Sequence, residues 1–286
     1  MSIKGVIVAA GYGTRFLPVT RTLPKEMLPL VDRPALDFIV QEFAEAGIED
    51  VILLTSRRKK ALDDWFDRDP ELEGVFTREG ATAKLEKSRP PALNVAMVRQ
   101  REMLGAGHAL LQIAPFVGED PVVVAYPDDL FGAPNCSRQL IDTYRETGCS
   151  VLACHDLPEE DLTRYGILDV EEAEGARRRV RRLVEKPPAG EAPSSLVSLG
   201  RYLYTPELFA ALRRHWERHD PSTGEYYPMA ATNDLAAEGK VVARIVDAPR
   251  WDTGAPLGFL KTMTEIALAR EDLGEAYRAW LKERLG

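Results

Sequence analysis

Short apolar runs alternate with amphipathic stretches through the first half of the chain. Residues 5–10 form a continuous apolar run, which is typical of a strand buried on both faces of a sheet. Residues 36–43 are apolar at helical spacing, between the start signals Asp32 and Pro34 and the stop signal Gly47. Further strands are predicted over 51–55, 94–100, 121–125 and 150–153, with helices over 59–66, 108–113 and 137–146. This order predicts an α/β fold with a doubly wound, mostly parallel mixed sheet.

The second half has a different pattern. Residues 165–170 and 178–184 flank a polar stretch over 171–176, which predicts a β-hairpin added to the sheet. Residues 256–285 have a largely helical pattern. Because no repeat, linker or low-complexity tract interrupts the chain, we expect a single domain over 1–286. Its parts are a first half over 1–155, a second half over 156–255 and a C-terminal helical segment over 256–286.

Charge and composition exclude several classes of partner. The 286 residues carry 37 basic and 45 acidic side chains, for a net charge of −8, so nucleic acid is not the expected main partner. The basic run Arg177–Arg182 lacks interleaved aromatic residues and is interpreted as a solvated hairpin or a subunit contact. No apolar stretch approaches the length of a membrane span. Three cysteines without C-x-x-C spacing favour a reducing, cytoplasmic location.

The loop after the first predicted strand has the chemistry of an anion site. Gly11 and Gly13 allow a close approach of the backbone to a phosphate, and Arg15 and Lys25 supply positive charge. Neither the dinucleotide fingerprint nor the P-loop fits, because Phe16 stands where each motif needs a glycine. A tight surface turn with two incidental cations is the alternative.

Carboxylates follow two other predicted strands. Asp128 and Asp129 come after the apolar run 122–125, and Asp252 stands in a W-D-T-G segment. Ligands of open parallel sheets bind beyond the carboxyl ends of the strands, so Asp128 is expected at the same rim as the glycine loop. Two carboxylates near a polyphosphate suit Mg²⁺. The alternative for each aspartate is a helix cap or an Asx turn.

Polar residues at two further strand ends suggest contacts with a substrate. Glu185 and Lys186 end a strand before Pro187, and neighbouring side chains of a strand share a face only if the chain bends. A solvated edge is the alternative. The amide of Gln100 offers a donor and an acceptor, which suits the edge of a pyrimidine, although it could equally be a polar strand end. His108 is assigned no chemistry.

These motifs together resemble a known family. A-G-Y-G-T-R-F-L-P and P-K-E-M-L-P are followed, in order, by V-R-Q-R-E-M-L-G-A-G-H-A, Y-P-D-D, Y-G-I-L-D, V-E-K-P and L-G-R-Y. This series, covering most of 3–270, resembles the sugar-1-phosphate nucleotidylyltransferases. The form K-E-M-L-P-L is most similar to that of the bacterial UTP–glucose-1-phosphate uridylyltransferases.

The resemblance implies a Rossmann-like nucleotide-diphospho-sugar transferase fold and a reaction of UTP with glucose 1-phosphate that gives UDP-glucose and pyrophosphate. It implies Mg²⁺ as cofactor, a nucleotide-binding half over 1–155, a sugar-binding half over 156–255, and a homo-oligomer, either dimer or tetramer. The implied catalytic residues are Arg15, Lys25, Asp128 and Lys186, and the metal ligands are Asp128 and Asp252. The nucleotide would contact Ala10, Gly11, Gly13, Thr14, Arg15, Gln100 and Gly105, and the sugar phosphate Gly166, Glu185, Lys186 and Gly200.

Some alternatives stay open. Uracil and thymine differ by one methyl group, so dTTP is an alternative nucleotide. The segment Glu225–Met229 departs from the family pattern, which leaves open another sugar or a remodelled subunit contact. An inactive sugar-nucleotide-binding regulator on the same fold is a further alternative. A nicotinamide-dependent oxidoreductase is disfavoured by the failed glycine motif and by Lys25.

Overall fold

The computed structural model describes residues 2–171 and 175–286. In this part of the chain a mixed sheet has the strand order β5-β4-β1-β6-β11-β8-β12-β10-β9, and two short ribbons pair β13 with β7 and β2 with β3. The strands are β1 (Lys4–Val8), β2 (Pro29–Leu30), β3 (Arg33–Pro34), β4 (Asp50–Thr55), β5 (Asn94–Arg99), β6 (Val122–Ala125), β7 (Asp129–Phe131), β8 (Ser150–Asp156), β9 (Gly166–Val170), β10 (Arg177–Glu185), β11 (Leu196–Tyr204), β12 (Val241–Ile245) and β13 (Arg250–Asp252).

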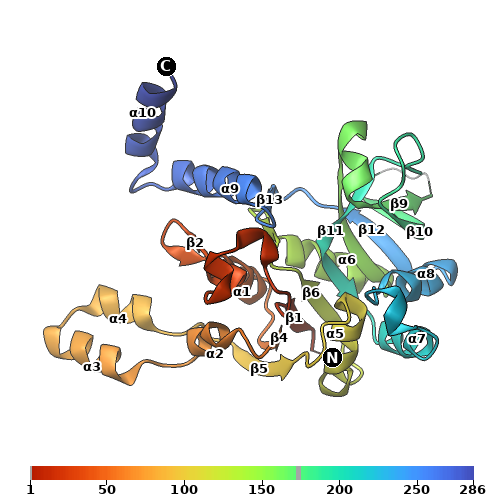
Figure 1. Ribbon diagram of the computed structural model, residues 1–286, viewed down its shortest axis with the longest axis horizontal. Helices are drawn as coiled ribbons and strands as arrows, with labels where there is room; N and C mark the ends of the chain where they lie inside the picture. The colour runs from red at the N-terminus through yellow and green to blue at the C-terminus, as the bar shows by residue number, and fades with distance from the viewer. Residues whose placement is uncertain (1, 172–174) are drawn as a thin grey trace.

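Helices cover both faces of the sheet and extend from its edges (Figure 1). The α-helices are α1 (Ala35–Glu45), α2 (Lys60–Phe66), α3 (Pro70–Glu79), α4 (Thr82–Ser88), α5 (Ala106–Val117), α6 (Cys136–Thr147), α7 (Glu207–Trp216), α8 (Met229–Ala237), α9 (Pro256–Ala269) and α10 (Gly274–Leu285). The 3₁₀ turns are η1 (Thr14–Phe16), η2 (Val19–Arg21), η3 (Lys25–Met27), η4 (Glu159–Arg164) and η5 (Pro221–Thr223).

Strands β5, β4, β1 and β6 are parallel neighbours, as predicted from the β-α-β order. One buried apolar cluster packs Phe43 of α1 and Leu140 of α6 against one face of the sheet. Another packs Ile113 of α5 and Leu208 of α7 against the opposite face. Because both faces are covered, β6 can be apolar at every position, and Val122–Ala125 is fully buried.

Antiparallel pairs enter the sheet with β11, which lies between β6 and β8. The predicted hairpin is confirmed, because β9 and β10 pair antiparallel from Val180↔Val170 to Glu185↔Gly166. Residues 172–174 of the predicted polar turn lie outside the described residues. The sheet is therefore mixed: β5, β4, β1 and β6 are parallel, β12 also pairs parallel with β8, and β11, β9 and β10 add the antiparallel pairs.

The elements that project from the body bury little surface. Helices α3 and α4 form an arm beside α2, and α10 extends beyond α9 to the C-terminus (Figure 1). Neither α3 nor α4 has a buried residue. Within the described ranges, no helix is both long and apolar enough to cross a membrane.

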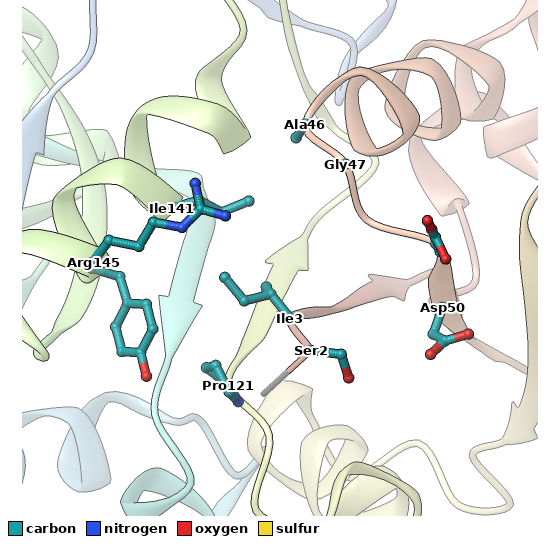
Figure 2. A pocket seen from close by; sticks show the side chains of 10 residues that line it. Ser2, Ile3, Ala46, Gly47, Asp50, Pro121, Ile141 and Arg145 are labelled. Atoms are coloured by element: carbon teal, nitrogen blue, oxygen red, sulfur yellow. The ribbon is translucent and has the colours of Figure 1, made fainter.

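A cavity of about 490 Å³ opens at the amino ends of β1, β4 and β6. Figure 2 shows Ile3, Asp50, Pro121 and Arg145 around it. The carboxyl ends of these strands lie at the opposite rim of the sheet, where the predicted site residues gather.

Candidate functional site

The glycine loop leaves β1 at the carboxyl rim of the sheet. Ala10 is buried, and Gly11 is exposed with no atom within 4 Å of the place where a Cβ would stand. Gly13 has φ of 67°, which favours glycine, and Thr20 Oγ1 donates to its carbonyl at 2.8 Å. Thr14 then begins the 3₁₀ turn that carries Arg15. The loop is thus held by a hydrogen bond at Gly13, and its backbone is accessible to a ligand at Gly11.

The structure brings three predicted residues together around Gly254. A Cβ at Gly254 would lie 3.2 Å from Asp252 Oδ1, 3.3 Å from Arg15 Nη1 and 3.4 Å from Asp128 Cβ. Arg15 also donates to the Gly254 carbonyl at 3.1 Å. The ribbon of β7 and β13 holds Asp128 and Asp252 side by side, since Asp252 pairs with the neighbouring Asp129. Residues more than one hundred positions apart in the chain therefore form one cluster of charge.

The carboxylates of this cluster are compatible with a hard divalent cation. Asp252 Oδ1 accepts a hydrogen bond from Gly254 N at 2.9 Å, so the Asx turn that stood as the alternative to metal binding is present, and the second oxygen remains available. No group of three or more His, Cys, Asp or Glu side chains suited to a metal occurs in residues 2–171 and 175–286. Two carboxylates suffice for Mg²⁺ when phosphate oxygens complete its shell. Asp128 and Asp252 therefore fit a magnesium–polyphosphate site.

Lys25 forms an ion pair with Asp128. It lies in η3, and the next residue, Glu26, is buried and accepts two hydrogen bonds from Lys59 Nζ at 2.7 and 2.8 Å. Burial lowers the pKa of Lys59, and the nearby Glu26 carboxylate opposes that effect. The sequence analysis did not identify this support, because a lysine in the run R-R-K-K after β4 has no local sign of burial.

Asp129 points away from the cluster into the protein. Its carboxylate accepts hydrogen bonds from Arg250 Nε at 2.6 Å and from Gly200 N at 2.7 Å. A Cβ at Gly200 would lie 2.6 Å from Asp129 Oδ2, so the missing side chain makes room for this carboxylate. Burial raises the pKa of Asp129, while the charge of Arg250 lowers it. Sequence reasoning missed Arg250, two residues before Asp252, as the partner that fixes the ribbon.

Glu185 and Lys186 lie at the end of β10, beside Gly166. Lys186 has φ of 44°, and this is the bend that lets both side chains share one side of the strand. Lys186 Nζ lies 3.4 Å from Glu185 Oε1, and a Cβ at Gly166 would lie 3.2 Å from Glu185 Oε2. Both charged residues are exposed. The predicted sugar-side residues Gly166, Glu185 and Lys186 are therefore neighbours.

Gln100 and Gly105 meet at the carboxyl end of β5. Gln100 is 5% exposed, and its Nε2 donates to the Gly105 carbonyl at 3.1 Å. Gly105 has φ of 98°, and a Cβ there would lie 2.5 Å from the Tyr226 carbonyl oxygen. Tyr226 also bonds through its backbone to Leu104 at 2.7 Å and Gly107 at 2.8 Å. The divergent segment Glu225–Met229 thus packs directly behind this loop, a contact that the sequence analysis did not predict.

Comparison with known proteins accounts for the motifs and the fold. The model of the nucleotidyl transferase family matches residues 4–268, and the chain belongs to this family. The predicted fold and resemblance are confirmed, and the chain is an enzyme of the nucleotidyltransferase class.

Among similar proteins, the UTP–glucose-1-phosphate uridylyltransferase of Bacillus subtilis is 42% identical over 94% of this chain and 92% of its own. The enzyme of the same name from Staphylococcus epidermidis is 40% identical over 98% of this chain and 97% of its own. A solved UDP-glucose pyrophosphorylase from Acinetobacter baumannii superimposes with a TM-score of 0.89 at 33% identity, covering 99% of both chains.

Proposed function

We propose that the protein joins UTP and glucose 1-phosphate to give UDP-glucose and pyrophosphate. The observation that carries the proposal is the cluster of Arg15, Asp128 and Asp252 around Gly254, at the rim from which the glycine loop emerges. Relatives named for this reaction support the choice of substrates. Structures of related proteins described as UTP-bound and as complexed with UDP-glucose support it further.

The strand order supports an arrangement of the two substrates along the rim. Gln100 follows β5, two strands outward from β1, and it suits the base. The glycine loop and the cluster of Arg15, Asp128 and Asp252 lie near β1 and β6, where the phosphates would bind. Glu185 and Lys186 follow on β10, where sugar hydroxyls and the sugar phosphate would bind. A nucleotide and a sugar phosphate would thereby meet over the aspartates.

In the proposed reaction, a phosphate oxygen of the sugar 1-phosphate attacks the α-phosphorus of UTP, and pyrophosphate leaves. The attacking oxygen is already anionic, so the protein needs to position and neutralise charge and no general base is required. Arg15 and Lys25 would neutralise the triphosphate and the departing pyrophosphate, and Lys186 would hold the second anion against repulsion. Asp128 and Asp252 would hold Mg²⁺, which when bound supplies further positive charge to the phosphates.

The proposal is tested by pyrophosphate release in the presence of Mg²⁺. UTP, dTTP, CTP, ATP and GTP are each paired with glucose, galactose, N-acetylglucosamine and mannose 1-phosphates. Release with UTP and glucose 1-phosphate, abolished by EDTA, is the expected result. Faster release with dTTP or another sugar would move the specificity within the same reaction. Binding of UDP-glucose without release from any pair would overturn the proposal and indicate an inactive regulator.

The same proposal includes a homo-oligomer, either dimer or tetramer. It is supported by large apolar side chains that remain exposed on the projecting C-terminal helices, namely Leu257, Leu260, Trp280 and Leu285. Light scattering coupled to size-exclusion chromatography is expected to give twice or four times the 31.8 kDa chain mass. A mass of one chain at micromolar concentration would refute it.

A further inference from the structure

The side-chain amide of Gln100 has a fixed orientation. Its Nε2 donates to the carbonyl oxygen of Gly105 at 3.1 Å, and a carbonyl oxygen can only accept. If the amide turned over, two oxygens would face each other. The Gly105 carbonyl therefore favours the orientation in which the nitrogen points at Gly105 and the oxygen points elsewhere.

His108 holds the other hydrogen of the same amide nitrogen. Gln100 Nε2 lies 3.3 Å from His108 Nδ1, and this ring nitrogen accepts the amide hydrogen in the tautomer that leaves Nδ1 unprotonated. The ring proton then resides on Nε2, which lies 3.2 Å from the side-chain amide of Gln112, whose oxygen can turn to accept it. Burial lowers the pKa of His108, more than the backbone carbonyl and carboxylate of Glu102 raise it. The neutral form needed for this bond is thus favoured.

An aromatic cluster fixes the position of the His108 ring. The ring lies with its centroid 4.9 Å from that of Trp216. The ring centroid of Trp216 in turn lies 5.5 Å from that of His219 and 5.4 Å from that of the buried Tyr226. Because Tyr226 also bonds to the backbone beside Gly105, the ring and the carbonyl that orient Gln100 belong to one packed unit.

The oxygen of Gln100 remains available to a ligand. It accepts no hydrogen bond from any residue that the structure describes, and it is not sealed off as a buried unpaired atom. Gln100 lines a hollow of about 790 Å³ together with Tyr12 of the glycine loop. Gln100 therefore carries an acceptor with no partner at the edge of the region where the base would bind.

We propose that His108 is a positioning residue for base specificity, which locks Gln100 so that only its oxygen faces the nucleotide base. The inference rests on the proposed function. Uracil carries a hydrogen on N3 and can donate it to this oxygen. Cytosine has an unprotonated acceptor at N3, so two acceptors would oppose each other. Thymine has the same N3 hydrogen as uracil. The Gln100 oxygen therefore selects UTP or dTTP against CTP, and it does not distinguish thymine from uracil by the methyl group.

The test compares kcat and KM for UTP and CTP, each with glucose 1-phosphate, in the native sequence and three variants. His108→Phe keeps a ring against Trp216 but has no acceptor. It is expected to raise the KM for UTP about tenfold, the worth of one hydrogen bond, with little change in kcat. The preference for UTP over CTP is expected to fall by about the same factor. His108→Asn can present an oxygen near the place of Nδ1 and is expected to retain the preference.

Trp216→Phe is the matched control, because it alters the same cluster without touching Gln100, and it is expected to keep the native UTP preference. An unchanged preference in His108→Phe would overturn the inference. So would an equal loss in all three variants, which would indicate packing alone. If His108→Phe does not fold, as judged by its thermal transition, His108→Ala replaces it. Failure of the proposed function itself is distinct, because the native protein would then release no pyrophosphate from UTP.

Discussion

Two adjacent carboxylates have opposite surroundings. The side chain of Asp128 is 39% exposed and pairs with Lys25, whereas the Asp129 carboxylate is buried between Arg250 and Gly200. Asp128 lies in the turn just before β7 and Asp129 is the first residue of that strand, so the two neighbouring side chains have separate partners. Asp128 thus faces the proposed phosphate site, and Asp129 fixes the ribbon that carries it.

Asparagine substitutions at these two positions are expected to separate chemistry from stability. Asp128→Asn removes a charge from the proposed metal site, so kcat for pyrophosphate release should fall about 100-fold or more. Its urea midpoint should stay near the native value. Asp129→Asn leaves the partly buried Arg250 without its counter-charge and is expected to lower the free energy of unfolding by about 3 kcal/mol. Near-native turnover in Asp128→Asn would contradict its assignment.

At the scale of elements, η3 is attached to the body through a buried ion pair. Lys25 projects to the cluster at the rim, while Glu26 turns inward to Lys59, the residue at the start of α2. Both partners of the pair are almost completely buried. Removing one of them leaves an uncompensated charge in the interior, which costs more than the pair itself contributes.

Lys59→Met is therefore expected to lower the free energy of unfolding by about 3–5 kcal/mol, measured by urea titration. Turnover should also fall, because η3 carries Lys25. Lys60→Met is the matched control, since Lys60 is the exposed neighbour, and it should be neutral. The double variant of Lys59→Met with Glu26→Gln should be more stable than Lys59→Met alone. Equal stability of the Lys59 and Lys60 variants would refute this role.

A second link between elements predicts a pH dependence. His155 of β8 lies with Nε2 3.0 Å from the carbonyl of Ala248, just before β13. Burial lowers its pKa below the ordinary 6.5, so as pH falls through 6.5 the unfolded chain takes up the proton first. The free energy of unfolding should therefore decrease from pH 6.5 toward the folded pKa and recover as pH rises. His155→Gln should make urea stability flatter over pH 5 to 7.5, and an unchanged slope would contradict the assignment.

At the scale of the whole molecule, local signals predicted the parallel half of the sheet and the rim loop. Apolar runs in the sequence mark β1 and β6. The glycines beside Arg15 mark the turn that follows β1. The supporting pairs could not be predicted. Arg250 meets Asp129 across 121 positions and Arg201 meets Glu42 across 159, and a charged residue in a sequence is normally evidence of exposure. The insertion of β11 between β6 and β8 likewise depends on pairing that no short segment encodes.

The strand order separates the proposed base and sugar sites across the molecule. From β5 the sheet continues through β4, β1, β6 and β11, which also pairs with β9. From β5 to β9 there are five strand spacings of about 4.8 Å. Gln100 after β5 and Gly166 at the start of β9 are therefore roughly 24 Å apart along the sheet. Groups that far apart, with no direct contact between them, should act nearly independently.

Gln100→Ala is therefore expected to raise KM for UTP about tenfold and leave KM for glucose 1-phosphate unchanged. Lys186→Ala should do the reverse, raising KM for the sugar phosphate about 10- to 100-fold, because a charge-assisted bond is lost. Arg181→Ala, on the same strand but paired with Asp169, is the control and should change neither. The double variant should show the product of the two single effects. Coupling above about 0.5 kcal/mol would mean that the two ends communicate, either through the aspartates or through Tyr226 and Asn233, which bond to the Gly105 loop and to Leu183 of β10.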